Sequence, residues 1–238
     1  MNFDNIKKQY LEEGGIVIKG LLKDKMINDL ETEYLSIVNE ITGKDFDSWH
    51  DKDLLQLLQN NQAVEANVYD RCRDTMSSLV TYSMSNKITD IVKHLIGNNS
   101  SCFNRRIMRI DLPLETKELA HWHQDYYYVK GNTDVIIVWI ALHDITWFNG
   151  CLSYMPKTHK LGIIEHDVPI GKKHVPSAIF DKEVRYLEMK KGDVLFFNTL
   201  LLHSSNMNYS DKIRYSLQFR YTPNELPIDP YMLGTTQI

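Results

Sequence analysis

The sequence predicts a mainly β protein in which N-terminal helices pack outside a sandwich or barrel of strands. Two observations support this prediction. Apolar residues recur at helical spacing up to about residue 98, whereas short β-type runs separated by turn-rich pieces follow from about residue 101. No flexible linker separates the two regions. We therefore expect one domain over residues 1–238, with helical support in 1–98, a β core in 99–222 and a C-terminal tail in 223–238.

The N-terminal region predicts one strand and three helices. After a short lead, the apolar run at residues 16–22 suits a strand, and Asp24 can cap a helix that Gly43 would end. Apolar residues spaced by three or four predict a second long helix over about 64–80 and a third over about 88–95. The polar stretch 44–61 predicts a loop with some helix.

Six short runs in the second region predict strands. They share β-branched and aromatic residues, and pieces rich in Gly, Asn, Asp and Pro separate them. The runs are residues 105–112, 134–142, 151–156, 184–189, 193–205 and 213–222.

Composition narrows the class of partner. The chain has 238 residues, a net charge of −4 and a pI of about 6.1, so we expect neither a nucleic acid nor an anionic membrane as its partner. No apolar stretch approaches the roughly 18 residues of a membrane span, and no secretion signal is expected. Three widely spaced cysteines, Cys72, Cys102 and Cys151, predict buried thiols in a reducing cytoplasm. The sequence indicates no oligomeric state.

The stretch HWHQDYYYV, residues 121–129, contains the first candidate metal ligands. His123 and Asp125 are two residues apart, so on an extended strand they would face the same way. His203 follows 80 residues later at the end of an apolar strand. Two histidine nitrogens and one carboxylate oxygen form the facial triad of non-haem Fe(II) oxygenases, which leaves three coordination positions open. His121 competes with His123, but it would lie about 13 Å from Asp125 on an extended strand.

Arg214 opens the run IRYSLQFRYT, 11 residues after His203. By period two, Arg214, Ser216, Gln218 and Arg220 share one face, opposite an apolar face. A buried arginine needs an anionic partner. A dicarboxylate co-substrate would supply one, and Ser205 could add a hydroxyl hydrogen bond.

These motifs together resemble the phytanoyl-CoA dioxygenase-like family of Fe(II)/2-oxoglutarate oxygenases. The shared features are HxD with a preceding tryptophan, a distal histidine, and an arginine 11 residues later. The stretches EEGGIVIKGLL, VWIALHDITWFNGCLSYMPKTHKLG and KKGDVLFFNTLLLHSS also resemble the family, so the likeness covers about residues 10–222. Lys157-Thr158-His159 departs from the family, which often has a glycine before Ser-His.

The resemblance implies a double-stranded β-helix, or cupin-like jelly roll, buttressed by helices. It implies that His123, Asp125 and His203 bind iron and that 2-oxoglutarate and O₂ are used. It further implies that Arg214 pairs with the far carboxylate of 2-oxoglutarate, assisted by Ser205.

The resemblance places Trp139 near the co-substrate and predicts hydroxylation of a small molecule. Residues that could border the substrate are less specific. Strand-face and sequence position suggest Gln124, Tyr126 with its neighbours Tyr127 and Tyr128, Arg106 with Arg109, Gln218, and Arg220. Residues 44–61 and 165–182 could form lids.

Two other functions stay open. A jelly-roll metalloprotein could use zinc, manganese or nickel for hydrolysis or isomerisation, which leaves Arg214 without a role. A non-catalytic protein could keep the fold and bind 2-oxoglutarate or iron. Succinate production that depends on iron and O₂ distinguishes the first function from these two.

Overall fold

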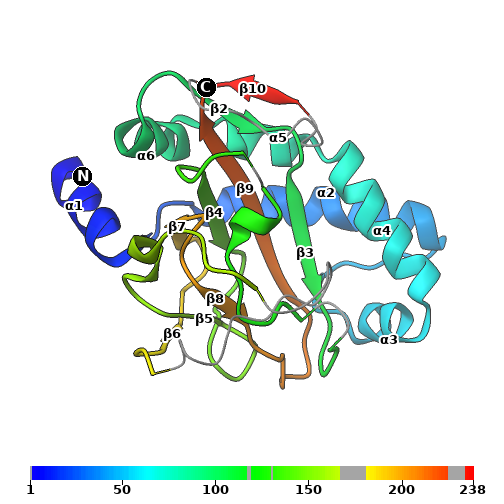
Figure 1. Cartoon of the computed structure of the whole chain (residues 1–238). Helices are drawn as coiled ribbons and strands as arrows, with labels where there is room; N and C mark the ends of the chain where they lie inside the picture. Colours follow the sequence, from blue (N-terminus) through cyan, green and yellow to red (C-terminus); the bar gives the residue numbers. More distant parts are fainter. Residues whose placement is uncertain (1, 117–118, 130, 167–180, 225–233) are drawn as a thin grey trace.

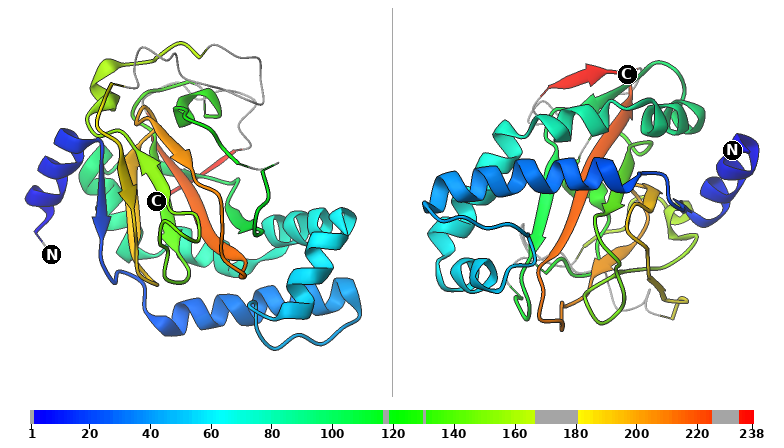
Figure 2. Two further views of the ribbon diagram at one scale, coloured as in Figure 1. Left: turned by 90° about the horizontal axis from the view of Figure 1, so that it is seen from below. Right: turned by 180° about the vertical axis from the view of Figure 1, so that it is seen from behind.

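Two antiparallel sheets form a jelly roll, and helices cover the outer face of the larger sheet (Figures 1 and 2). This fold class agrees with the sequence prediction. The computed structural model describes residues 2–116, 119–129, 131–166, 181–224 and 234–238. The predicted lid at 165–182 therefore lies largely outside the described residues.

Six α-helices are described. They are α1 (Phe3–Glu13), α2 (Asp24–Thr42), α3 (Lys52–Asn60), α4 (Gln62–Thr75), α5 (Ser77–Ser83) and α6 (Asn86–Ile96).

The helices differ from the sequence prediction at three places. The predicted short lead is helix α1, which Asn2 caps by accepting from the Asn5 N–H and which ends at Gly14 with φ of 88°. Asp24 lies in the first turn of α2 instead of capping it. The single helix predicted over 64–80 is two helices, because Met76 is extended (φ −67°, ψ 110°) with its side chain buried.

The larger sheet has strand order β1-β7-β4-β9-β2-β10, and β3 also pairs with β9. Its strands are β1 (Gly15–Ile18), β2 (Ser100–Phe103), β3 (Ile107–Asp111), β4 (Ile136–Ala141), β7 (Val194–Asn198), β9 (Arg214–Pro223) and β10 (Thr235–Gln237). Strand β10 falls in the predicted tail and pairs with β2, which the sequence prediction missed.

The smaller sheet has order β6-β5-β8. Its strands are β5 (Leu152–Tyr154), β6 (Arg185–Leu187) and β8 (His203–Ser205). An antiparallel bridge between His123 and His203 extends it by one short segment. The stretch that contains the predicted ligands His123 and Asp125 therefore lies beside β8, which contains the third, His203.

The predicted strand 193–205 is two strands in different sheets. Asn198 turns the chain: its backbone carbonyl accepts from Leu201 N at 2.9 Å, and its side-chain Oδ1 accepts from Leu200 N at 2.8 Å. This turn separates β7 from β8 and places His203 in the smaller sheet. Apolarity alone could not reveal the turn, since Leu200, Leu201 and Leu202 are all buried.

The core has two layers, as the alternation on β9 predicts. One face of β9 packs on the helices through Tyr215, Leu217, Phe219 and Tyr221, and the right-hand view of Figure 2, seen from behind, shows α2 crossing in front of the sheet. A second apolar cluster lies between the sheets and includes Ile137, Trp139, Leu152 and Phe197. The polar face of β9 therefore points into the jelly roll. All three cysteines are buried and free, in agreement with the prediction.

Candidate metal centre

Three side chains converge between the two sheets. His123, Asp125 and His203 are all buried, and each offers one ligand atom that lies within 4.8 Å of the other two. Asp125 Oδ1 lies 3.2 Å from His123 Nε2 and 3.8 Å from His203 Nε2. This separation leaves room for one ion among the three atoms. Two imidazoles and one carboxylate are a donor set that Fe(II) accepts.

Local backbone structure brings these ligands together. His123 is held opposite His203 by two backbone hydrogen bonds, of 2.9 and 3.1 Å. Asp125 does not continue a strand; it opens the short 3₁₀ helix η1 (Asp125–Tyr127). The prediction that His123 and Asp125 lie on one strand face was therefore wrong in detail, although a turn brings the two side chains to the same point.

Both histidines present Nε2 to the site. Nδ1 of His123 lies 2.6 Å from the carbonyl oxygen of His121, and Nδ1 of His203 lies 3.0 Å from that of Leu201. A carbonyl can only accept, so each Nδ1 carries the proton and donates it. Each Nε2 therefore keeps its lone pair for a metal ion, and the hydrogen bond fixes the ring. His121 contributes its backbone rather than its exposed side chain.

Electrostatics keep the ligands in the forms that bind metal. Burial, together with the nearby His123, lowers the pKa of His203 to about 4, so its imidazole is neutral at neutral pH. Burial alone would raise the pKa of Asp125. The positive charge of Arg220, whose Nη2 lies 3.6 Å from Oδ2, opposes this effect and helps to hold that pKa well below its ordinary value.

A cavity of about 290 Å³ opens on these ligands. Ser205, Trp139, Gln218 and Arg220 line it, as the sequence suggested for co-substrate or substrate contacts. The other described lining residues are Tyr69, Ile107, Arg109, Leu119, Ala120, Tyr128, Ile137, Leu152 and Phe197, together with the three ligands.

Three proposed substrate residues are not among the described residues that line this cavity. Gln124 is fully buried and joins two other segments of the chain: its Nε2 donates to the carbonyls of Gly162 and Leu200, each at 2.8 Å. Arg106 donates from Nε to Ser83 Oγ in the helical layer. Tyr126 packs its ring against Tyr127. The structure thus gives these residues supporting contacts away from the metal ligands.

Arg214 is also absent from the described lining residues, and it is already paired. Its Nη2 lies 2.6 Å from Asp111 Oδ2, and its Nη1 donates to the Gly150 carbonyl. Asp111 Oδ1 also lies 2.5 Å from Arg109 Nη2, so one carboxylate joins two guanidinium groups. Gly150 has φ of 86°, and a Cβ there would lie 2.7 Å from the Asn206 carbonyl oxygen, which explains the glycine in the NGCL turn.

Sequence reasoning missed Asp111 and Tyr69. Asp111 is two residues from Arg109 on β3, so the two side chains share a face. Asp111 also lies directly opposite Arg214 on β9, so knowledge of the strand pairing would have revealed its role. Tyr69 comes from helix α4, and no local pattern marks it as a cavity residue.

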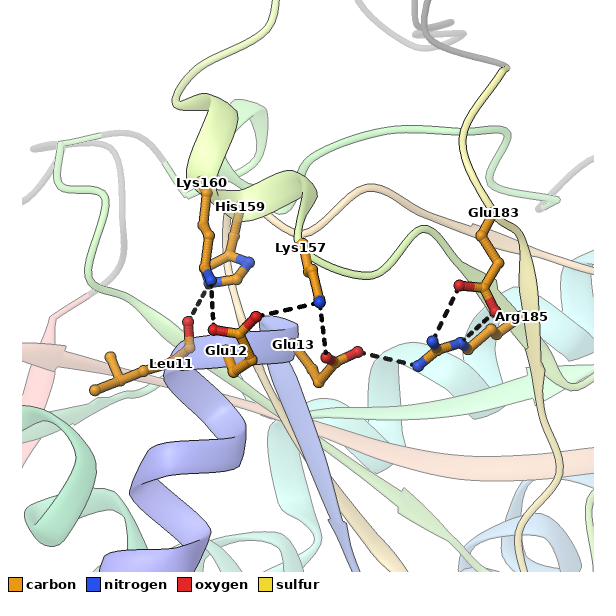
Figure 3. A network of polar contacts seen from close by, with 8 residues as sticks. All are labelled: Leu11, Glu12, Glu13, Lys157, His159, Lys160, Glu183 and Arg185. Atoms are coloured by element: carbon orange, nitrogen blue, oxygen red, sulfur yellow. Dashed lines mark hydrogen bonds and ion pairs between the residues drawn. The ribbon is translucent and has the colours of Figure 1, made fainter.

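A second cavity, of about 240 Å³, backs on to the metal centre. The two cavities share Leu152, Phe197 and His203 as walls. Glu13 and Arg185, which also line the second cavity, belong to a surface network of ion pairs. We call this the rim network; its members are Glu12, Glu13, Lys157, Lys160, Glu183 and Arg185 (Figure 3).

Comparison with known proteins gives both family and fold. Residues 10–216 match the profile of the family described as phytanoyl-CoA dioxygenase (PhyH). A probable phytanoyl-CoA dioxygenase from Caenorhabditis elegans is 30% identical over 163 residues, covering 63% of this chain and 52% of that protein. The peroxisomal phytanoyl-CoA dioxygenase of Homo sapiens is 27% identical over 228 residues, covering 90% of this chain and 67% of that protein. The chain thus spans about half to two thirds of these relatives.

The fold is shared with a more distant solved structure. EctD from S. alaskensis, solved with 2-oxoglutarate and 5-hydroxyectoine, superposes with a TM-score of 0.71 at 13% identity, covering 98% of this chain and 80% of that one. None of the helices in the described ranges combines the length and hydropathy needed for a bilayer span.

Proposed function

Because the chain belongs to the phytanoyl-CoA dioxygenase family, we propose that it is a non-haem Fe(II)/2-oxoglutarate-dependent dioxygenase. We propose that it hydroxylates an unactivated C–H bond of a small molecule. The observation that supports this most is the buried His123–Asp125–His203 group, whose donor set and open side fit Fe(II). Iron with 2-oxoglutarate and O₂ would supply the oxidation, with succinate and CO₂ as co-products.

The charges around the site favour an anionic co-substrate. Arg109, Arg214 and Arg220 face Asp111 and Asp125, so three guanidinium groups against two carboxylates leave one positive charge before any metal binds. His203 is neutral and does not change this balance. A divalent ion adds two further positive charges, and 2-oxoglutarate, a dianion, would offset much of the total.

Different residues would contact different parts of the co-substrate and the substrate. Ser205 and Trp139 line the metal cavity, which supports our proposal that they flank 2-oxoglutarate. The far carboxylate would replace Asp111 at Arg214. This is supported by the present contact of 2.6 Å between Arg214 Nη2 and a carboxylate oxygen of Asp111. Asp111 would stay paired through Arg109. Gln218 and Tyr128, which also line the cavity, would contact the substrate.

A second candidate function follows from the same pairing. Because Arg214 already has Asp111 as its anionic partner, the structure needs no co-substrate to satisfy its charge. A jelly-roll protein that uses another divalent metal, or that binds 2-oxoglutarate or iron without catalysis, would have the same contacts. A cytoplasmic location stays a prediction, since the human relative is described as peroxisomal.

Succinate formation tests the proposed activity. We expect the protein to convert 2-oxoglutarate slowly to succinate, in a manner that needs both Fe(II) and O₂. His203→Ala should abolish this conversion, because it removes one of three metal ligands. His159→Ala is the matched control, since His159 contacts the Leu11 carbonyl at the surface. Succinate formation that survives His203→Ala would contradict the proposal, and iron binding without succinate would favour the second candidate.

A further inference from the structure

Arg220 contacts a metal ligand rather than open solvent. We propose that Arg220 is a positioning residue that holds the outer oxygen of Asp125, so that this carboxylate binds the metal through Oδ1 alone. The inference rests on the proposed function only for the presence of a divalent metal at the site.

The two oxygens of Asp125 face different partners. Oδ1 points to the ligand nitrogens, at 3.2 Å from His123 Nε2 and 3.8 Å from His203 Nε2. Oδ2 lies 3.6 Å from Arg220 Nη2. One oxygen therefore faces the metal position and the other faces a cation.

The guanidinium of Arg220 has few other contacts. Its side chain is 10% exposed and that of Asp125 is 7% exposed, so solvent and salt screen this pair weakly. Its Nη2 has a long contact of 3.5 Å with Gln218 Oε1, and its buried Nε donates to no acceptor among the described residues. The charge of Arg220 is therefore directed mainly at Asp125.

The two other arginines near the metal centre pair with a different carboxylate. Arg109 and Arg214 both pair with Asp111. Strand β9 fixes the difference: Arg214 lies opposite Asp111 on β3, whereas Arg220 lies six residues further along, opposite Ile137 on β4. Among the ion pairs of the described residues, the one between an arginine and the ligand carboxylate is thus made by Arg220.

Control of Asp125 matters because a carboxylate can bind a metal through one oxygen or both. The facial triad keeps three positions open for a two-point chelating co-substrate and one further ligand. If Oδ2 also bound, one of these positions would be lost. The guanidinium of Arg220 attracts Oδ2 away from the metal, which opposes two-oxygen binding by Asp125 and keeps the position available.

The direct test is the infrared spectrum of the carboxylate. The separation between the symmetric and antisymmetric stretches is wide for one-oxygen binding and narrow for two-oxygen binding. The probe is Zn(II) alone, added to the full-length protein with ¹³C-labelled aspartate side chains, and the metal-induced difference spectrum isolates the bound carboxylate. We expect a wide separation in the unmodified protein and a narrow one in Arg220→Gln.

Three further measurements complete the test. Arg220→Lys, which keeps the charge, should restore the wide separation. Arg185→Gln, which removes a guanidinium of the rim network, should leave the spectrum unchanged. The dissociation constant for 2-oxoglutarate on the iron-loaded protein should rise about tenfold in Arg220→Gln, a typical effect of losing a residue that orients a metal ligand.

Two results would overturn the proposal. One is a narrow separation in the unmodified protein, a measurement that needs no variant to fold. The other is a wide separation in Arg220→Gln with unchanged 2-oxoglutarate affinity. The Zn(II) spectrum requires neither 2-oxoglutarate nor turnover, so failure of the dioxygenase proposal can be distinguished from failure of this one.

Discussion

Two groups of charged residues, one buried near the metal centre and one at the surface, both pair carboxylates with basic side chains. The cavity cluster consists of Arg109, Asp111, Asp125, Arg214 and Arg220, with side chains 2–22% exposed. The rim network joins the end of α1 to the 157–160 segment and β6, with side chains 23–63% exposed (Figure 3). Their distances are similar: 2.6 Å for Arg214–Asp111 and 2.8 Å for Lys160–Glu12.

The comparison shows that burial, more than distance, decides what an ion pair does. Water and salt screen the rim network, so each of its pairs contributes little to folding. In the cavity cluster a charge that loses its partner stays out of water, and this is costly. Buried charges kept beside a metal-binding group are therefore better explained by ligand binding than by stability.

The largest expected effect is on stability, from Asp111→Ala. This change leaves Arg109 and Arg214 without their shared carboxylate, and we expect a loss of about 3–5 kcal/mol in the free energy of unfolding. Urea denaturation of the metal-free protein measures it. Asp111→Asn, which keeps the shape, is the matched control and should lose less. A loss no larger than that of a rim variant would remove the distinction between the two groups.

The next effect concerns acid stability. Burial, reinforced by the nearby His50, lowers the pKa of His143 from 6.5 to about 4, and its Nε2 accepts from the Tyr215 N–H. The unfolded chain therefore binds more protons than the folded chain between these values. The contribution of neutral His143 to the free energy of unfolding is fully present above pH 6.5. It falls by about 3 kcal/mol at most as the pH falls to about 4.

Denaturation curves across this pH range measure the effect of His143. His143→Gln keeps a polar side chain but cannot titrate, so its stability should fall less steeply between pH 6.5 and 4. Equal slopes in the two proteins would show that other groups dominate acid unfolding.

The smallest expected effect comes from the rim network. Glu12→Gln removes an exposed carboxylate charge that pairs with both Lys157 and Lys160, so the urea midpoint should hardly move. Adding salt should remove any remaining difference from the unmodified protein. A large, salt-resistant loss would show that the network holds α1 on the jelly roll.

The sequence predicted the fold class and the residues of the metal-binding group because patterns within short stretches, taken in order along the chain, resemble those of a known family. Alternating apolar residues indicated the strands, and the HxD pair with a distant histidine indicated the ligands. Contacts made by pairing between distant strands were not predictable in the same way. The Arg214–Asp111 pair depends on the register of β3 with β9, and the position of His203 depends on the Asn198 turn inside a run that reads as one strand.

Side-chain direction was the other limit. Gln124 lies between two metal ligands in the sequence, yet its side chain donates to the carbonyls of Gly162 and Leu200 and does not line the metal cavity. Arg106 and Arg109 are three residues apart, and Arg106 contacts the helical layer whereas Arg109 lines the metal cavity. Sequence position could not separate these two directions.

The most direct measurement is an anaerobic titration of the metal-free protein with Fe(II) and then with 2-oxoglutarate, followed by visible absorption. If the buried triad is an iron site that takes the keto acid, a weak metal-to-ligand charge-transfer band will form, and Asp125→Ala will lose it. If Fe(II) binds and no band forms, the site holds a metal for another chemistry. If Fe(II) does not bind to His123, Asp125 and His203, the central claim is contradicted.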